Sequence, residues 1–236
     1  RARLWSGQAT YDFYSTDSYE INLDKLFGGG VTWENDIWNL RISYSQSKID
    51  LENNTIKPLE QALQNASLAG WPAAGNFTNL AIDNKMVRYY TAGVSYDDAD
   101  WLIQSELGFV DIDSLLTPGT VSGYLSIGRK LGAVTPFVVG AWTKATDDKL
   151  TIPTPSIAAY IPLQQISQYA FNQFYVAQHT LSIGARWDVL PKVALKAQWD
   201  KTWVDEYGSL LLSKRDSAIA EKKQLDIFSI SVDFIF

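Results

Sequence analysis

Apolar and polar residues alternate with a period of two along several segments of this chain. In the segment 37–47 the apolar positions are Trp38, Leu40, Ile42 and Tyr44, and the positions between them carry polar side chains. Successive side chains of a β-strand point to opposite faces, so this pattern predicts strands with one apolar and one polar face. Four segments show it clearly and six more weakly, which predicts ten strands: 1–14, 23–34, 37–47, 85–96, 101–110, 122–131, 134–143, 174–187, 193–200 and 228–236.

The connections between these segments alternate strictly between short and long. The short ones are residues 35–36, 97–100, 132–133 and 188–192, and the long ones are residues 15–22, 49–84, 111–121, 144–172 and 202–223. Bacterial outer-membrane barrels have short turns on the periplasmic side and long loops outside. Most of the segments also have the roughly 9 to 14 residues that a tilted strand needs to cross a bilayer.

Aromatic residues near the strand ends favour a membrane over a soluble sheet. Aromatic girdles flank the lipid-facing belt of transmembrane barrels, and the matching positions here are Trp38, Tyr44, Tyr90, Tyr96, Trp101, Phe109, Trp187 and Trp199. Backbone amides in hydrocarbon must pair with one another, so such strands close and their polar face becomes an interior. The pattern predicts an all-β, antiparallel transmembrane β-barrel, with residues 1–236 as one domain in a bacterial outer membrane.

Composition excludes several other classes of protein. No stretch of the 236 residues approaches the roughly 20 consecutive apolar residues of a membrane helix. The formal net charge of −6 argues against a nucleic-acid partner. With no Cys and one His, disulfides and thiolate zinc sites are excluded, and we expect no cofactor and no metal site.

Four stretches resemble the trimeric porins of Gram-negative bacteria: 40–44, 124–129 leading to 135–137, 194–199, and the end of the chain, 228–236. The resemblance implies that the chain is the C-terminal part of a larger barrel of about 16 strands. It also implies a homotrimer, contacts with membrane lipids and lipopolysaccharide, and passage of small hydrophilic solutes. Val232, Phe234 and the final Phe236 resemble the signal that the outer-membrane assembly machinery reads. Ten strands could also close alone, but side chains would fill so small a barrel.

Charged residues on the polar face are candidate pore-lining residues. They comprise the basic Arg41, Lys130, Arg186 and Lys196 and the acidic Glu106, Asp200 and Asp233. Rings of charge in a narrow channel impose ion selectivity. The alternative is that these residues form salt bridges between neighbouring strands, and the mixture of signs leaves anion or cation preference open. Arg129 falls on the apolar face, which is tolerable near an interface or a subunit contact.

Two long loops are candidates for a constriction inside the barrel. Residues 58–66 predict a short helix with Pro58 in its first turn. The loop 144–172 competes for the same role with an apolar stretch at 157–161 and a Gln-rich stretch that follows it. The alternatives are that these loops cap the barrel or pack on a neighbouring subunit.

Three further features suggest chemistry, but each has a simpler interpretation. His179 and Ser182 are three residues apart, so on a strand they point to opposite faces and cannot form a catalytic pair. The acidic residues of 97–100 could bind calcium but fit a solvated hairpin better. Gly28–Gly30 lies within a strand, where a bulge or a close subunit approach explains it better than phosphate binding. We therefore expect a passive diffusion channel and no enzyme, with a non-conducting scaffold barrel that holds a partner as the alternative.

Overall fold

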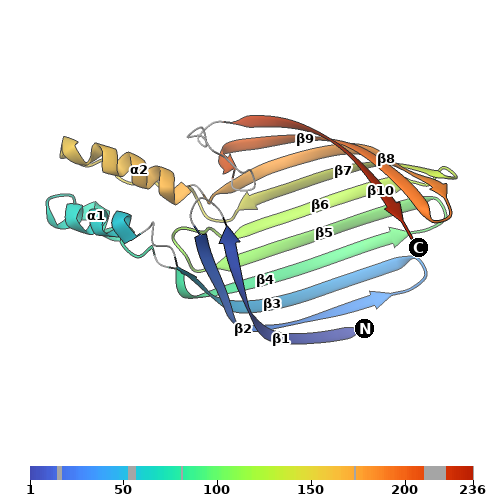
Figure 1. Ribbon diagram of the computed structural model, residues 1–236, viewed down its shortest axis with the longest axis horizontal. Coiled ribbons are helices and arrows are strands. Elements are labelled where there is room, and N and C mark those ends of the chain that lie inside the picture. Colours follow the sequence, from blue (N-terminus) through green and yellow to red (C-terminus); the bar gives the residue numbers. More distant parts are fainter. Residues whose placement is uncertain (15–17, 53–56, 81, 173, 210–221, 236) are drawn as a thin grey trace.

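Ten antiparallel strands form one sheet in which every strand pairs with its neighbours in sequence (Figure 1). The computed structural model describes residues 1–236 apart from 15–17, 53–56, 81, 173, 210–221 and 236. The strands are β1 (Ala2–Tyr14), β2 (Ser18–Glu34), β3 (Trp38–Glu52), β4 (Ile82–Asp97), β5 (Trp101–Ile112), β6 (Thr120–Arg129), β7 (Val134–Ala145), β8 (Val176–Leu190), β9 (Val193–Ser209) and β10 (Lys223–Phe234). The all-β antiparallel fold with ten strands, predicted from the alternation, is confirmed.

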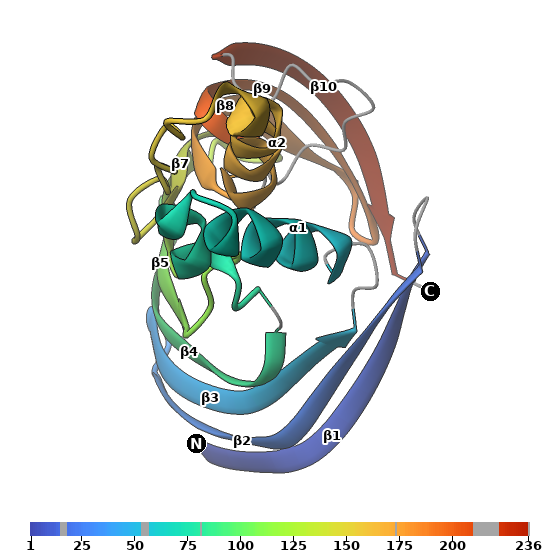
Figure 2. The same cartoon turned by 90° about the vertical axis from the view of Figure 1, so that its left-hand side faces the viewer.

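The sheet curves strongly around its strand axis (Figures 1 and 2). Within the described residues no pairing joins β1 to β10, so the sheet is open along these two edges. Both ends of the chain lie on the side of the short turns (Figure 1). The strands β1 and β10 consequently run in opposite directions, as they would in a closed barrel with an even number of strands.

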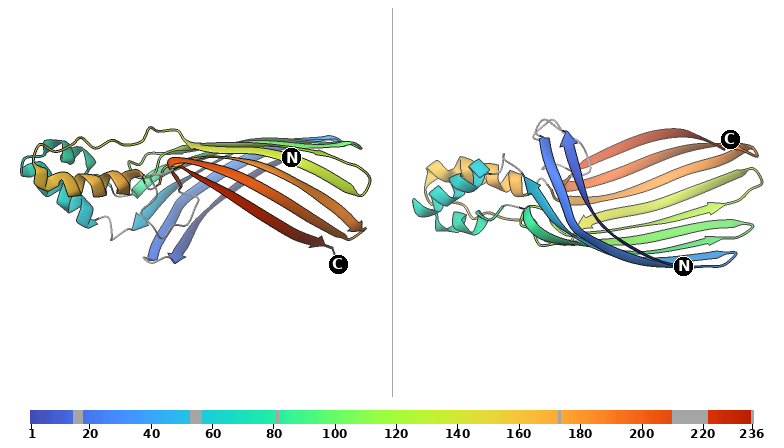
Figure 3. Two further views of the ribbon diagram at one scale, coloured as in Figure 1. Left: turned by 90° about the horizontal axis from the view of Figure 1, so that it is seen from above. Right: turned by 60° about the horizontal axis from the view of Figure 1, so that its bottom comes forward.

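The strands β1 and β2 bend sharply towards their long-loop end, as the second view in Figure 3 shows. The register of β2 against β3 shifts between Asp24 and Phe27, and Lys25 has a φ of 53°. The register of β1 against β2 shifts between Gly7 and Ala9. Such bulges bend a strand and increase its twist, so these irregularities account for the curvature.

One face of the sheet is apolar and exposed. Ile42 is 62% exposed, Phe228 79% and Ile230 83%. The buried apolar core of the protein lies elsewhere, in the loops. A soluble sheet would bury its apolar face on a core, whereas this one presents it outward, as outer-membrane β-barrel proteins do. The chain therefore has the fold of an outer-membrane protein. Among the described helices, none has the length and apolar character needed to cross a membrane.

The outward face carries the two groups of aromatic rings that a bilayer-spanning sheet needs. Tyr90 lies between Tyr44 and Phe109, with ring centroids 4.9 and 5.9 Å away. Beside the short turns, the rings of Trp38 and Tyr96 are 4.8 Å apart. Trp38 and Tyr44 are six residues apart on β3, or about 20 Å along the strand. The two groups therefore flank the apolar positions Leu40 and Ile42 of β3, in the arrangement that aromatic girdles have around the apolar band of a membrane barrel.

The long loops build a small cap beyond the strand ends. It contains α1 (Lys57–Leu68), the 3-10 helices η1 (Pro72–Phe77) and η2 (Ala158–Tyr160), and α2 (Ile161–Asn172). Its buried core combines three loops: Leu63, Trp71 and Leu80 come from the first, Leu116 from the second, and Ile152 and Phe171 from the third. The helix expected at 58–66 is confirmed as α1. The helix α2 was not predicted, although Pro162 in its first turn is a helix-start signal.

Candidate functional site

The concave face of the sheet carries the polar half of the alternation. Cross-strand pairing sets Arg41 beside Gly93, Gly93 beside Glu106, and Glu106 beside Tyr124, so these residues share one face. Further along the same face, small polar side chains such as Ser182 are buried, whereas the outward face is exposed. Polar groups therefore line the hollow side of the sheet, and apolar groups cover its convex side.

Arg41 and Glu106 form an ion pair across three strands. The guanidinium Nη2 of Arg41 lies 2.7 Å from the Glu106 carboxylate, although β4 runs between β3 and β5. The residue of β4 between them is Gly93, and a Cβ placed there would lie 3.5 Å from the carboxylate, in ordinary van der Waals contact with the bridge that passes over it. Both predicted pore-lining residues thus lie on the concave face, where each neutralises the other.

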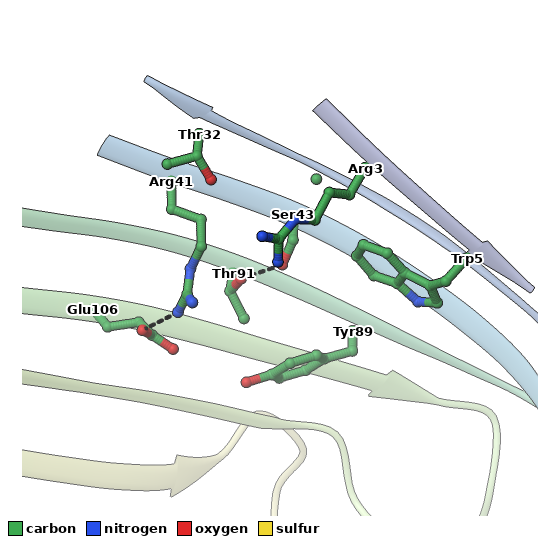
Figure 4. Close-up of a pocket in the computed structure, with 9 residues that line it drawn as sticks. Arg3, Trp5, Thr32, Arg41, Ser43, Tyr89, Thr91 and Glu106 are labelled. Carbon is green, nitrogen blue, oxygen red and sulfur yellow. Dashed lines mark hydrogen bonds and ion pairs between the residues drawn. The ribbon is translucent and has the colours of Figure 1, made fainter. Parts of the chain in front are cut away.

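A hollow of about 320 Å³ adjoins this pair (Figure 4). Its lining side chains come from β1 to β5: Arg3, Trp5, Thr32, Arg41, Ser43, Tyr89, Thr91 and Glu106, with Gly30. The hydroxyls of Ser43 and Thr91 are hydrogen-bonded at 2.5 Å. Figure 4 shows Arg3 next to Ser43, with the Arg41–Glu106 pair on one side and Trp5 and Tyr89 on the other.

A second charged group lies on β8, β9 and β10. Arg186 contacts Asp188 at 2.9 Å and Asp233 at 3.3 Å. Lys196 pairs with Arg186 in the sheet, and its ammonium lies 5.0 Å from the centre of the Phe137 ring. Asp200 accepts a hydrogen bond of 2.6 Å from the Gln198 amide. Arg186 and Asp233 therefore form a salt bridge between strands, which was the alternative to a role in ion selectivity. Within the described part of the chain, Lys196 and Asp200 have no ion-pair partner.

Lys130 lies at the short-turn rim of the concave face, where it bridges two turns. Its ammonium contacts the Asp97 carboxylate and donates a 2.8 Å hydrogen bond to the Asp98 carbonyl. Asp98 closes its own turn by accepting hydrogen bonds from the Tyr96 hydroxyl and from the backbone amides of Trp101 and Asp100. These donors, the Tyr96 hydroxyl above all, hold the pKa of Asp98 below its ordinary value. The predicted solvated hairpin at 97–100 is therefore what the structure contains.

Arg129, the exception on the outward face, lies over an aromatic ring. Its guanidinium carbon is 4.8 Å from the centre of the Trp101 ring, and the two residues pair directly in the sheet. Both stand at the short-turn end of their strands. A cation held on an amphipathic ring beside a turn fits the interfacial position expected for it.

The cap does not enter the concave face in the described residues. The helices α1 and α2 lie beyond the long-loop ends of the strands (Figures 1 and 3), and in the end-on view they stand in front of the opening (Figure 2). Of the roles considered for the two long loops, the structure shows capping at the end of the sheet and not constriction midway along it.

The other candidate features have structural explanations. His179 points outward, where its ring stacks on Trp203 with centroids 5.1 Å apart, while Ser182 is buried on the concave face. Their opposite orientation is as predicted. No cluster of three or more metal-ligating side chains occurs among the described residues. Gly28–Gly30 pairs without a break with both neighbouring strands, and the register shift of β2 lies between Asp24 and Phe27, so the bulge expected at these glycines is wrong. The Trp5 ring covers Gly28 and its edge reaches Gly30.

Arg3, Trp5 and Tyr89 were not among the predicted pore-lining residues. Arg3 and Trp5 share the parity of the polar face in β1, and that alternation was the signal that could have found them. Tyr89 is next to Tyr90, which was assigned to the girdle, and the neighbours of a strand residue point to the other face. Of the predicted assembly signal, Val232 and Phe234 lie exposed on the outward face of β10, and Phe236 lies outside the described residues.

No protein-family model and no curated protein matches this chain. A search of solved structures finds similarity to the outer-membrane expressed OmpT of Vibrio cholerae, with 11% sequence identity and a TM-score of 0.49. The match covers 96% of this chain and 64% of that one, so the chain spans less than two thirds of that protein's length.

Proposed function

We propose that this protein is an outer-membrane porin, a passive channel through which small hydrophilic solutes or ions diffuse down their gradients. The observation that carries this proposal is the division of the sheet into an exposed apolar convex face and a charged concave face. Contact with lipid stabilises the apolar convex face, and the charged concave face requires contact with water.

The open edges strengthen the case for an enclosed lumen. Unpaired backbone groups cannot face hydrocarbon, so in a bilayer the edges β1 and β10 must pair, either with each other or with further strands. Either closure turns the concave face into the inside of a barrel. A barrel of about 16 strands leaves an aqueous channel, and the homotrimer implied by the resemblance to porins belongs to this proposal, as do contacts of the convex face with lipids and lipopolysaccharide.

The composition of the concave wall suits passage without chemistry. Ion pairs such as Arg41–Glu106 supply local charge of both signs, and hydroxyls such as those of Ser43 and Thr91 supply neutral hydrogen-bonding groups. Such a wall can exchange hydrogen bonds with a passing hydrated solute while holding it weakly, which conduction requires. No covalent step is needed, and the proposal assigns the protein no enzymatic activity.

Single-channel recording of the natural full-length protein in a planar bilayer tests the proposal. We expect stepwise currents that increase linearly with voltage. The protein's folded state is checked in the same sample by its heat-dependent mobility in electrophoresis. A folded protein that gives no current would instead support the alternative of a non-conducting scaffold barrel that holds a partner.

A further inference from the structure

We infer that the hollow between β1 and β5 is a binding subsite for small aromatic carboxylates, of which benzoate is the simplest. The inference rests on the proposed channel, since it assigns a solute class to the wall of that channel. Three features of the hollow carry it: an aromatic ring with a free face, a cation beside that ring that forms no ion pair with any described residue, and a local excess of positive charge.

The ring of Trp5 lies flat against the sheet. Trp5 pairs with Gly28 across β1 and β2, and a Cβ on Gly28 would collide with the indole. The ring extends as far as Gly30, where a Cβ would lie 3.7 Å from its edge. The two glycines therefore form a floor that supports one side of the indole. The other side faces the hollow, and Trp5 remains 39% exposed, so a planar ring can stack there.

Arg3 supplies the charge that a carboxylate needs. It is two residues from Trp5 on the same face of β1, about 7 Å along the strand. That separation is comparable to the length of a benzoate ion. Among the described residues no carboxylate forms an ion pair with Arg3, and Figure 4 shows its side chain extended into the hollow. A guanidinium binds a carboxylate through two parallel hydrogen bonds, which fixes the orientation of the ligand.

The remaining side chains favour an anion over a cation. Glu106 is the carboxylate among the lining residues, and it is held at 2.7 Å by Arg41. Two arginines against one glutamate leave the hollow with a formal charge of +1. Across from Trp5, the Tyr89 side chain lies over the position of Gly108, where a Cβ would be 3.5 Å from the Tyr89 hydroxyl. A second ring thus borders the space in which the solute ring would sit.

The size and openness of the hollow indicate weak, reversible binding. Its volume of about 320 Å³ is at the lower end of the range for small-molecule sites. Apart from Thr91, its lining residues are exposed or half-exposed, so little of the ligand would be removed from water. Weak binding is what a channel requires, because the solute must also leave.

Blockade of the single-channel current by benzoate tests this inference with the natural full-length protein. We expect benzoate to interrupt the current in a concentration-dependent way. Three control probes each lack one feature of benzoate: acetate lacks the ring, benzylamine lacks the negative charge, and cyclohexanecarboxylate lacks the planar ring. Each of these three probes should block more weakly. Arg3→Gln should weaken block by benzoate roughly tenfold, because it removes one charge-assisted contact. Trp5→Leu should weaken it by roughly threefold to tenfold, because it removes a stacked pair of aromatic rings. Gly28→Ala, which displaces the ring, should weaken block by benzoate while the effect of acetate stays the same.

Lys196→Gln is the matched control, because it removes a concave-face cation that lies on another ring, Phe137. It should leave the benzoate block within twofold of the original. A clear current with no benzoate block, or an equal loss of block in Lys196→Gln and Arg3→Gln, would overturn the subsite but not the channel. Absence of any current would contradict the channel itself. Saturation-transfer NMR of benzoate with the detergent-solubilised protein then still reports whether the Arg3-dependent contact exists.

Discussion

On the concave face, aromatic rings repeatedly cover glycines of the adjoining strand. Trp5 lies over Gly28, Tyr89 over Gly108, and the Phe137 ring occupies the position that a Cβ of Gly184 would need. Glycine weakens a strand because it has no side chain to pack, and an aromatic ring placed over it restores contact in the sheet. The glycines also allow the rings to lie flat against the sheet, so the space above its concave face stays open.

The Arg41–Glu106 pair should set part of the ion preference of the channel. Glu106→Gln leaves the Arg41 charge uncompensated and should shift the reversal potential in a salt gradient towards anion preference, while Arg41→Gln should shift it towards cations. Stability should change by no more than about 1 kcal/mol, because the pair is solvent-accessible. The double variant should restore a value near the original. Shifts of the same sign in both single variants would contradict the assignment of this pair to the lumen wall.

Asp98 should make the β4–β5 turn sensitive to acid. Its folded-state pKa is lowered from 3.8, so the carboxylate stabilises the fold at pH values above 3.8, and this contribution is lost as the pH falls through the lower folded-state value. Urea unfolding monitored by tryptophan fluorescence should show Asp98→Asn to be less stable than the original protein at neutral pH. The difference between the two should shrink below pH 3.8. A difference that is independent of pH would show that the ionised carboxylate contributes nothing.

At the scale of elements, the sequence located the short-turn ends of the strands better than the long-loop ends. The starts of β5 at Trp101, β7 at Val134 and β9 at Val193 were predicted to the residue. In contrast, β9 was expected to end at Asp200 but continues to Ser209. Alternation marks only the part of a strand that has lipid on one side and polar surroundings on the other. Beyond the bilayer both faces of a strand can be polar, so the strand continues to pair with its neighbours although its sequence no longer alternates between apolar and polar residues.

The cap should behave as a separate packing unit. Leu63→Ala removes a fully buried side chain from its core and should destabilise the cap by roughly 2 to 5 kcal/mol. Limited proteolysis should then cut the loops faster while the strands remain protected. Leu68→Ala in the same helix α1 is the control, because Leu68 is 84% exposed. Equal proteolysis of the two variants would mean that the cap core does not hold the loops together.

At the scale of the whole molecule, the two faces of β10 should tolerate charge very differently. Ile230→Arg places a cation on the convex face and should cost about 2 to 4 kcal/mol if the site is near the bilayer midplane. Ser231→Arg, on the next residue and the concave face, should cost much less. Urea titration of folding into lipid vesicles measures both. A similar cost for both substitutions would contradict the division of the sheet into a lipid face and a water face.

Only part of the candidate site could be predicted from the sequence. Parity alone placed Arg41 and Glu106 on the polar face, but their pairing across three strands depends on the register of β3, β4 and β5. The hollow additionally requires the position of the Trp5 ring over β2, which no local pattern encodes. The apolar–polar alternation therefore predicts on which face of the sheet each residue lies, whereas the pairing register between strands decides which residues it contacts.

Spin-label accessibility along β10 tests the central claim most directly. The chain has no cysteine, so single-cysteine variants at positions 227 to 233 each carry one label in the protein reconstituted in lipid. We predict that positions 228, 230 and 232 are accessible to oxygen, which partitions into lipid, and that positions 227, 229, 231 and 233 are accessible to a water-soluble nickel complex. Loss of this period of two, or protection of the even positions from both reagents as in a dry protein core, would contradict the account.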